Sequence, residues 1–372
     1  MKYYIIAGEA SGDLHASNLI KELKKKDINA EFRAWGGDLM QEQGAEIVKH
    51  YRDLAFMGFS EVVSNLFTIL KNIRLCERDI DNWQPDVLIL VDYPGFNLRI
   101  AEYAHQKGLK VVYYISPQIW AWKKSRVYAI KKHVDKMLVI LPFEKDFYAK
   151  YNFQVEFVGH PLLDALPNEI NNEKAFREEN GLNEKPIVAL LPGSRKQEIE
   201  KMLSIMLEIV DYYPEYQFVI AGAPSIDESF YLKIICKKDI VLVKNKTQKL
   251  LLASTAALVT SGTATLETAL LGVPEVVCYK GSQISYQIAK RIVDIPFISL
   301  VNLIMNKEVV KELIQNDFNS TNLKIELDKI LMNENNRAQI LNDYKGLKAK
   351  LGKGGASEKA ADEIIRFLNP VK

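Results

Sequence analysis

A carboxylate follows the most apolar run in the first half of the chain. Asp92 comes directly after residues 87–91 and is followed closely by Pro94 and Gly95. In open parallel sheets, ligands bind beyond the carboxyl ends of the strands, so a carboxylate at this point is well placed to act as a general base. An ordinary carboxylate pKa of about 4 would leave it ionised at neutral pH. The alternative is that Asp92 caps a helix beginning near Phe96. We favour the catalytic role.

A second polar segment, residues 8–15, follows the apolar run 3–7. It lacks the three-glycine spacing of a dinucleotide-binding turn, so NAD binding is not expected. A tight turn with a helix cap would explain one serine or one aspartate there, but not the glutamate and the histidine as well. We therefore expect this turn to bind a ligand through Glu9, Ser11, Gly12, Asp13 and His15.

The second half of the chain holds a turn suited to phosphate, formed by Gly193, Ser194 and Arg195 after the apolar run 187–191. Free N–H groups at the start of the next helix would bind an anion, and the guanidinium of Arg195 fits phosphate oxygens. A diphosphate is the expected ligand. An ordinary turn capped by Ser194, with Arg195 in solvent, is an equally good interpretation of this segment alone.

A hydroxyl-rich glycine turn follows the buried run 257–260. Its polar and small residues are Ser261, Gly262, Thr263, Ala264 and Thr265. The next helix presents about half a positive charge at its start, where phosphates could bind. Glu267, one turn further on, could accept hydrogen bonds from two ribose hydroxyls. The alternative is a capping-box arrangement between Glu267 and Ser261 or Thr263.

No metal site is expected. Asp79 and Asp81 match the Asp-x-Asp pattern by which some glycosyltransferases hold a divalent ion, but they end an amphipathic helix and are expected to face solvent. His50, His105 and His133 have no ligand-spaced partners. The three cysteines are far apart, so neither a disulfide framework nor a zinc site is expected. No cofactor is therefore predicted.

Short β-branched and aromatic runs alternate with helical periodicities along the chain, as in parallel sheets covered on both faces. The first half has such runs at 3–7, 87–91, 111–115 and 137–141, and the second half at 187–191, 218–221, 240–243, 257–260 and 276–279. The pattern predicts an α/β protein with two Rossmann-like domains, 1–164 and 165–345. Successive helices are expected after Asn302, and a last helical segment, 346–372, is expected to pack on an N-terminal domain.

The charge balance and the apolar segments limit the partners. The 49 basic and 47 acidic side chains nearly cancel, so no nucleic-acid partner is expected. The N-terminal apolar run is too short for a signal peptide, and the uncharged stretch 250–266 contains hydroxyl residues and a glycine, so we expect a cytoplasmic protein.

A broad apolar stripe recurs at helical spacing between residues 59 and 73. Such a stripe ordinarily faces a core, and the sequence alone favours that interpretation, but an apolar face could also lie on a bilayer surface. Trp120 and Trp122, beside Lys123, Lys124 and Arg126, could add a cationic rim, although a plain surface helix explains them as well. The residues of the stripe that would contact a membrane are Phe59, Val62, Val63, Leu66, Phe67 and Leu70.

Seven segments together resemble the lipid A disaccharide synthase family, in the family's order from residue 7 to about 315. They are residues 7–13, 57–62, 92–97, 116–122, 158–162, 191–195 and 261–267. Asn302, Glu312 and Gln315 also match. The family usually has prolines before this asparagine and this glutamate, and this chain lacks both, which affects the expected local loop shape.

The resemblance implies a GT-B fold, with two Rossmann-like domains facing across a cleft, and a peripheral inner-membrane enzyme that is often dimeric. It implies transfer of 2,3-diacylglucosamine from UDP to the 6-hydroxyl of 2,3-diacylglucosamine 1-phosphate, inverting to a β-1,6 linkage. Asn97, Gln118 and Trp120 would then join the acceptor side, and Asn302 the UDP side. Because these substrates carry acyl chains, the resemblance also implies that the apolar stripe between residues 59 and 73 contacts acyl chains or the membrane. The rival interpretations are another GT-B UDP-sugar enzyme, such as a peptidoglycan-type glycosyltransferase or an epimerase, and a two-lobed sugar-binding protein without catalysis.

Overall fold

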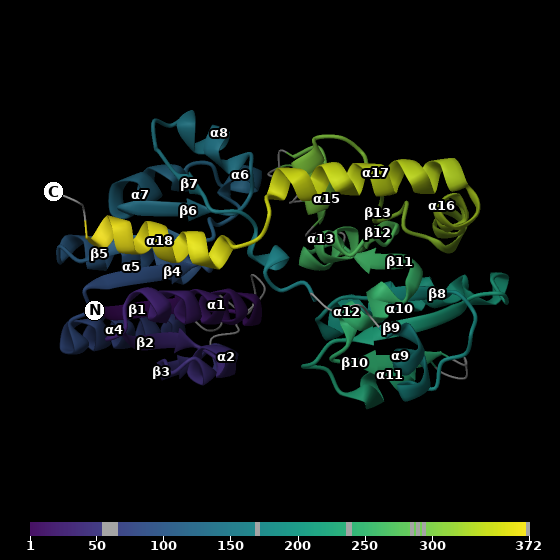
Figure 1. The fold of residues 1–372 in the computed structure, drawn as a ribbon, viewed down its shortest axis with the longest axis horizontal. Helices are drawn as coiled ribbons and strands as arrows, with labels where there is room; N and C mark the ends of the chain where they lie inside the picture. The colour runs from purple at the N-terminus through teal and green to yellow at the C-terminus, as the bar shows by residue number, and fades with distance from the viewer. Residues whose placement is uncertain are drawn as a thin grey trace. The chain divides into compact units, whose positions relative to one another are not determined.

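The computed structural model describes residues 1–53, 66–167, 172–235, 240–282, 286–287, 291 and 295–369. The chain forms two compact units (Figure 1). Unit 1 consists of Met1–Asp164 together with Leu351–Lys372, and unit 2 consists of Ala165–Lys350. The second unit is therefore inserted in the sequence of the first.

Unit 1 is built on a seven-stranded parallel sheet with the order β3-β2-β1-β4-β5-β6-β7. Its strands are β1 (Lys2–Ala7), β2 (Glu31–Gly36), β3 (Glu46–His50), β4 (Val87–Val91), β5 (Lys110–Tyr114), β6 (Lys136–Val139) and β7 (Glu156–Phe157). The strands β2 and β3 follow β1 on one side of it, and the strands β4 to β7 follow one another on its other side. The carboxyl ends of β1 and β4 therefore form the topological switch point, where Ala7 pairs with Val91.

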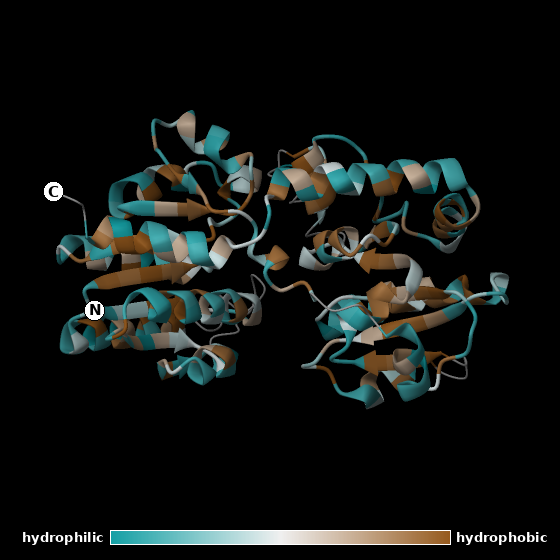
Figure 2. Ribbon diagram, viewed as in Figure 1, coloured by the Kyte–Doolittle hydropathy of each residue, from teal (hydrophilic) through white to brown (hydrophobic). Residues whose placement is uncertain are grey.

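Helices cover both faces of this sheet. They are α1 (Ala10–Lys26), α2 (Asp38–Glu42), α4 (Leu66–Trp83), α5 (Pro94–Gln106), α6 (Ile119–Trp122), α7 (Arg126–His133), α8 (Glu144–Ala149) and α18 (Ala356–Leu368), with 3-10 turns at Tyr51–Asp53 and Pro161–Leu163. On one face, the core joins alternate strand residues such as Ile6, Leu90 and Tyr113 to α4, α5 and α7. The strands of both units are predominantly apolar, as expected for sheets buried on both sides (Figure 2).

Unit 2 contains a six-stranded parallel sheet with the order β10-β9-β8-β11-β12-β13. Its strands are β8 (Ile187–Leu191), β9 (Gln217–Gly222), β10 (Val241–Lys244), β11 (Ser254–Thr260), β12 (Glu275–Tyr279) and β13 (Lys311–Ile314). The switch point lies between β8 and β11. The prediction of successive helices after Asn302 is wrong for Lys311–Ile314, which form β13 and pair with β12. This short edge strand has only a few apolar side chains, so its sequence gives little indication of a strand.

The helices of unit 2 are α9 (Glu173–Glu179), α10 (Lys196–Glu208), α11 (Glu228–Ile235), α12 (Thr247–Leu252), α13 (Thr263–Leu270), α15 (Leu300–Met305), α16 (Ser320–Met332) and α17 (Glu334–Leu351), with a 3-10 turn at Val210–Tyr212. The core on one face joins β8, β9 and β11 to α9 and α12. The helix α16 packs against β11, β12 and β13. No helix among the described residues is long and apolar enough to cross a membrane.

The last helix, α18, completes unit 1 by packing against α1 (Figure 1). Gly352, Gly354 and Gly355 precede it with φ between 73° and 99°, the left-handed region that favours glycine. The carboxylate of Asp164 accepts hydrogen bonds from the backbone N–H groups of Gly355 at 2.6 Å and of Ser357 at 3.0 Å. Asp164 therefore caps the helix at the point where the chain has returned to unit 1.

Candidate active site

Asp92 lies at the switch point of unit 1, immediately after β4, where it is half-buried. Burial is the main cause that raises its pKa, to about 6, and the negative charge of Glu9 adds to the effect, while the backbone N–H of Tyr93 opposes it. The pKa is therefore higher than the ordinary value expected from the sequence. A carboxylate with this pKa is still roughly nine-tenths ionised at pH 7 and is a stronger base than an exposed aspartate.

The backbone around Asp92 is held in an unusual conformation. Asp92 and Tyr93 have φ of 44° and 50°, a left-handed geometry that costs about 1–3 kcal/mol per residue and is typical of functional sites. The carbonyl of Asp92 accepts hydrogen bonds from Asn97 Nδ2 at 2.7 Å and from the Tyr113 hydroxyl at 2.5 Å. Gly8 lies against this loop, since a Cβ there would come within 2.4 Å of the Tyr93 ring. These contacts stabilise the strained loop.

The alternative role for Asp92, as the cap of the following helix, does not match the structure. The helix α5 begins at Pro94, and its N-cap residue is Tyr93, whose side chain makes no cap hydrogen bond. Asn97, which the resemblance placed on the acceptor side, is fully buried and supports the Asp92 loop from within. The sequence did not indicate a role for Tyr113, because a tyrosine within an apolar strand is ordinarily expected to be a core residue.

The residues of the turn 8–15 fall into two sets, those placed to meet a ligand and those that point into unit 1. Glu9 is the N-cap residue of α1 without a side-chain cap bond, and it is close enough to Asp92 to affect its pKa. Ser11 is exposed and Gly12 is buried, with a Cβ position only 3.2 Å from that of Ala7. Glu9 and Ser11 are therefore the members of the turn best placed to meet a ligand.

Asp13 and His15 point into unit 1. The buried carboxylate of Asp13 accepts hydrogen bonds from the backbone N–H groups of Gly37 at 2.7 Å and of Leu39 and Met40 at 3.2 Å. It therefore caps the start of α2. Burial lowers the pKa of His15 to about 4, which leaves the ring neutral. Both residues position the turn, and neither offers an exposed charge to a substrate.

The segment after β5 is arranged around a buried carboxylate that sequence reasoning missed. Glu144 is fully buried and accepts hydrogen bonds from the Trp120 indole at 3.3 Å and from the backbone N–H of Leu141 at 2.9 Å. Burial raises its pKa to about 7, and these hydrogen bonds oppose the shift. Trp120 is itself buried and stacks edge-on against Phe143, whereas Gln118 is exposed. Gln118 is thus the freer of the two predicted acceptor contacts.

In unit 2, the first predicted phosphate turn follows β8. Gly193 has φ of 108°, which favours glycine, and its Cβ position lies 3.6 Å from Thr260, so this turn adjoins the end of β11. The helix α10 begins at Lys196, with Arg195 rather than Ser194 at its N-cap. Ser194 and Arg195 are exposed, and the Arg195 guanidinium forms an ion pair of 2.9 Å with Glu198. Such an exposed pair contributes little to stability, so an anion can compete for Arg195.

The second predicted phosphate turn follows β11, at the other side of the switch point. Gly262 is the exposed N-cap residue of α13 and has no side-chain cap bond, so the N–H groups of Thr263 and Ala264 have no partner within the helix. The Thr265 hydroxyl donates to the Gly262 carbonyl at 2.8 Å, and that of Ser261 donates to the Ile298 carbonyl at 3.2 Å. The two phosphate turns thus meet at one switch point, where open α/β sheets bind ligands.

Glu267 does not form the alternative capping box. Its carboxylate accepts a hydrogen bond of 2.9 Å from Gln248, and it remains half-exposed one turn into α13. An acceptor for ribose hydroxyls is therefore available beside the phosphate turn.

Asn302 is fully buried and uses all of its hydrogen-bonding capacity inside unit 2. Its Oδ1 accepts from the N–H groups of Val309 at 2.7 Å and Val310 at 3.0 Å, and its Nδ2 donates to the Val310 carbonyl and to Glu312, both at 2.9 Å. Glu312 in turn accepts the backbone N–H groups of Ile298 and Ser299 at 2.9 Å. Asn302 therefore supports the Ile298 segment that receives Ser261, and it has no atom left for UDP.

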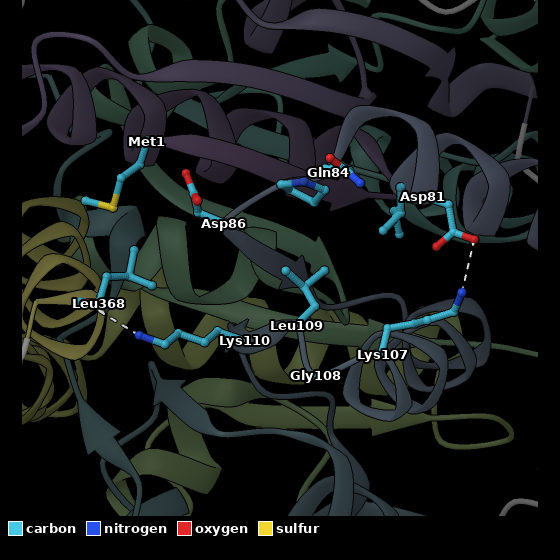
Figure 3. Close-up of a pocket in the computed structure, with 11 residues that line it drawn as sticks. Met1, Asp81, Gln84, Asp86, Lys107, Gly108, Leu109, Lys110 and Leu368 are labelled. Carbon is cyan, nitrogen blue, oxygen red and sulfur yellow. Dashed lines mark hydrogen bonds and ion pairs between the residues drawn. The ribbon is translucent and has the colours of Figure 1, made fainter.

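The Asp-x-Asp pair has other partners. Asp81 is exposed, but Asp79 is not, because it accepts two hydrogen bonds from Arg33 and one from the Tyr4 hydroxyl. The expectation that both carboxylates face solvent is thus wrong for Asp79. Asp81 borders a cavity of about 630 Å³ at the amino ends of β1, β4 and β5, the opposite edge from Asp92 (Figure 3). Lys107, which also borders this cavity, pairs with Asp81 at 3.3 Å. Because the cavity lies at the opposite edge of the sheet, it is separate from the site around Asp92.

Only part of the predicted apolar stripe lies in the described residues. Phe59, Val62 and Val63 fall outside them, and Leu66 begins α4 without a described side chain. On α4, Phe67 is 88% exposed and Leu70 is 38% exposed, whereas Ile73 is buried in the core. The helix thus presents two large apolar side chains to its surroundings at its start.

The chain was compared with known families and proteins. The family model described as lipid-A-disaccharide synthetase matches residues 3–365. The lipid-A-disaccharide synthase of Syntrophus aciditrophicus is 40% identical over 371 residues, which cover 98% of this chain and 97% of that protein. The synthase of Geobacter metallireducens is 36% identical over 370 residues, covering 98% and 96%.

Solved structures share the fold at low sequence identity. The UDP-GlcNAc 2-epimerase of Neisseria meningitidis bound to UDP-GlcNAc has a TM-score of 0.68 at 13% identity, covering 98% of this chain and 100% of that chain. The S. aureus MnaA–UDP structure has a TM-score of 0.69 at 15% identity, covering 100% and 97%. These likenesses, with the two parallel sheets, confirm the predicted α/β GT-B fold. The motif resemblance is confirmed too: the chain belongs to the lipid-A-disaccharide synthase family, the glycosyltransferases of lipid A biosynthesis.

Proposed function

We propose that the protein joins UDP-2,3-diacylglucosamine to 2,3-diacylglucosamine 1-phosphate, giving the β-1,6-linked disaccharide 1-phosphate and UDP. The acceptor 6-hydroxyl attacks the anomeric carbon of the donor, the bond from that carbon to the diphosphate breaks, and the configuration inverts. Inversion in one step needs a base for the hydroxyl proton and a site for the charge of the departing UDP. Family membership supports the reaction.

The placement of Asp92 is the observation that carries the proposal. It combines a position at the switch point, a loop held in a strained conformation by Tyr113 and Asn97, and a pKa raised to about 6 by burial and Glu9. A base of this kind is expected where a proton is removed near neutral pH. In the proposal, Asp92 takes the proton of the acceptor hydroxyl as the new bond forms.

Unit 2 is the proposed donor site. Arg195 and the N–H groups at the start of α13 would bind the diphosphate, with Ser261, Gly262 and Thr263 forming the turn around it. Glu267 would accept the ribose hydroxyls. This arrangement supplies a cation and helix N-termini for the leaving group, so we propose that turnover needs no divalent metal or other cofactor.

The substrates carry acyl chains, so we also propose that the enzyme works at the cytoplasmic surface of the inner membrane. The exposed Phe67 and Leu70 on α4 support this proposal, because burying such side chains in a bilayer is favourable. A homodimer is a further expectation from the family resemblance.

The test is incubation of the purified protein with the defined donor and acceptor, with and without EDTA. We expect UDP release and a disaccharide 1-phosphate by mass spectrometry, with a β anomeric signal by NMR, unaffected by EDTA. Epimerised donor without disaccharide would indicate an epimerase, and binding without UDP release would indicate a sugar-binding protein. Loss of activity in EDTA that magnesium restores would contradict the metal-free donor site.

A further inference from the structure

Two cations gather on one exposed aromatic ring at the carboxyl edge of the sheet in unit 1. Lys123 Nζ and the Arg126 guanidinium carbon each lie 5.2 Å from the ring centroid of Trp122, which is 45% exposed. Attraction between a cation and an aromatic face holds each of them there, but the two positive charges repel each other. Among the residues that the structure describes, neither has a carboxylate within ion-pair distance.

Arg126 differs in this respect from Arg33 and Arg177, two other arginines shielded from solvent. The Arg33 guanidinium pairs with Asp79 at 2.8 Å, and that of Arg177 pairs with Glu173 at 2.7 Å. Arg126 is half-buried, like Arg33, and burial lowers its pKa, with no carboxylate among the described residues to offset the effect. A charge that is partly removed from water without a counter-ion is costly, so an anion from outside the chain would be bound favourably.

The position of Arg126 relates this cationic pair to Asp92. Arg126 begins α7, which follows β5 and returns toward the amino edge of the sheet, so the residue lies near the carboxyl ends of the strands. Its charge is close enough to the Tyr113 hydroxyl to lower the pKa of that group, although burial raises it more. The same hydroxyl donates to the Asp92 carbonyl. An anion on Arg126 would therefore lie near the Tyr113 hydroxyl, at the same edge of the sheet as the proposed base.

The chemistry of the pair favours a phosphate group. A guanidinium presents parallel N–H groups that match two phosphate oxygens, and an ammonium group adds a point charge. The exposed ring of Trp122 offers an apolar surface next to that charge, which suits a sugar phosphate better than a free ion.

We propose that Arg126 and Lys123 bind the phosphate of the acceptor and so make the enzyme select a phosphorylated sugar. The inference rests on the proposed function for the identity of the acceptor. It makes Arg126 a specificity-determining residue, because an acceptor without the phosphate would lose this contact while its attacking hydroxyl stays unchanged.

The experiment measures binding without donor, by titrating the protein in detergent with 2,3-diacylglucosamine 1-phosphate and with the same sugar lacking the phosphate. The wild type should bind the phosphorylated sugar more tightly. Arg126→Met should weaken binding of the phosphorylated sugar by about tenfold or more and leave the affinity for the unphosphorylated sugar unchanged. The affinity of Arg126→Lys for the phosphorylated sugar should lie between those of Arg126→Met and the wild type. Arg99→Met, which removes an exposed arginine of the same unit, is the matched control and should behave as wild type.

Several results would overturn the inference. One is equal affinity of the wild type for the two sugars, and another is unchanged discrimination in Arg126→Met. A third is weaker binding of Arg126→Met to phosphatidylglycerol vesicles with its discrimination between the sugars intact, which would assign the contact to a lipid headgroup. If circular dichroism shows that Arg126→Met does not fold, the discrimination of Arg126→Lys and Lys123→Met between the two sugars, compared with that of the wild type, decides whether the inference stands. Failure of the proposed function looks different: the acceptor binds, but no disaccharide forms when donor is added.

Discussion

The Tyr113 hydroxyl donates a hydrogen bond of 2.5 Å to the backbone carbonyl of Asp92, although 21 residues separate the two in sequence. The bond joins the adjacent strands β4 and β5 at their carboxyl ends. It fixes the loop whose left-handed conformation sets the direction of the Asp92 side chain. Tyr113 is therefore a positioning residue for the proposed base.

We expect Tyr113→Phe to lower turnover by about 10- to 100-fold, because a small displacement of a catalytic group is costly. The free energy of unfolding should fall by only about 0.5–1.5 kcal/mol, as for the loss of one hydrogen bond. Steady-state kinetics and chemical denaturation measure the two effects. Tyr114→Phe is the control, since that side chain points to the other face of the strand. Equal loss of turnover in both variants would contradict the role of Tyr113.

Asp92→Asn should lower turnover by about a hundredfold to ten-thousandfold, since the amide keeps the size of the side chain and removes its basicity. UDP affinity, measured by titration calorimetry, should stay unchanged, because the proposed phosphate contacts lie in unit 2. Asp81→Asn changes an exposed aspartate of the same unit and should retain full activity. Near-normal turnover of Asp92→Asn would leave Glu9 as the better candidate, since Asp13 is engaged in capping α2.

The pH profile should report the raised pKa of Asp92. Below a pH of about 6 the base becomes protonated, so kcat/KM should fall toward about tenfold for each pH unit. Glu9→Gln removes a negative charge that raises this pKa, so the acid limb should move to lower pH, while burial keeps the pKa above that of an exposed aspartate. An inflection that stays in place in Glu9→Gln would show that another group controls the profile.

Asn302→Ala should act on stability. It removes the hydrogen bonds of a buried amide and leaves the N–H groups of Val309 and Val310 without their acceptor, so the free energy of unfolding should fall by about 2–4 kcal/mol. Asn316→Ala, at an exposed asparagine of unit 2, should cause little change. A variant of Asn302 with wild-type stability and weakened UDP binding would instead support the direct contact expected from the sequence.

The exposed start of α4 predicts membrane affinity. Replacing Phe67 and Leu70 by serine should weaken binding to vesicles of phosphatidylethanolamine and phosphatidylglycerol by about tenfold or more, from the loss of buried apolar surface. Thermal unfolding should be unchanged, because both side chains are already exposed. Ile28→Ser, at a residue that is 93% exposed, serves as the control and should bind vesicles as wild type does. Equal weakening by Ile28→Ser would show that binding does not depend on α4.

The sequence predicted the continuous apolar strands well and the strands of mixed polarity poorly. The expected bounds of β4 and β8 agree with the structure, because both are continuous apolar runs. β2, β3 and β13 were not predicted, since each combines apolar residues with charged ones such as Arg33, Lys49 and Lys311. Such strands are stabilised by pairing with neighbours in the sheet, and no local pattern records that pairing.

The residues of the candidate site could also be predicted only in part. Asp92 could be identified from its place after an apolar strand, but Tyr113 could not, because its contact depends on which strands are adjacent. Asp13 and Asn302 were expected to meet ligands, whereas the structure shows their polar atoms bonded to backbone groups of their own units. Residue type and spacing do not distinguish a polar side chain that binds a substrate from one that holds a loop.

The insertion of unit 2 within unit 1 has a consequence for synthesis on the ribosome. The helix α18 is made after unit 2, and until it emerges the face of α1 that it covers stays open to water and to other chains. The contact between Asp164 and Gly355 joins residues 191 positions apart, so forming it across an unfolded segment would cost about 5 kcal/mol of loop-closure entropy. Because unit 2 is continuous in sequence, it can fold before the chain is finished and shorten that loop. The nascent protein should therefore depend on chaperones mainly through unit 1, most of which is synthesised before unit 2 but which is completed only after it.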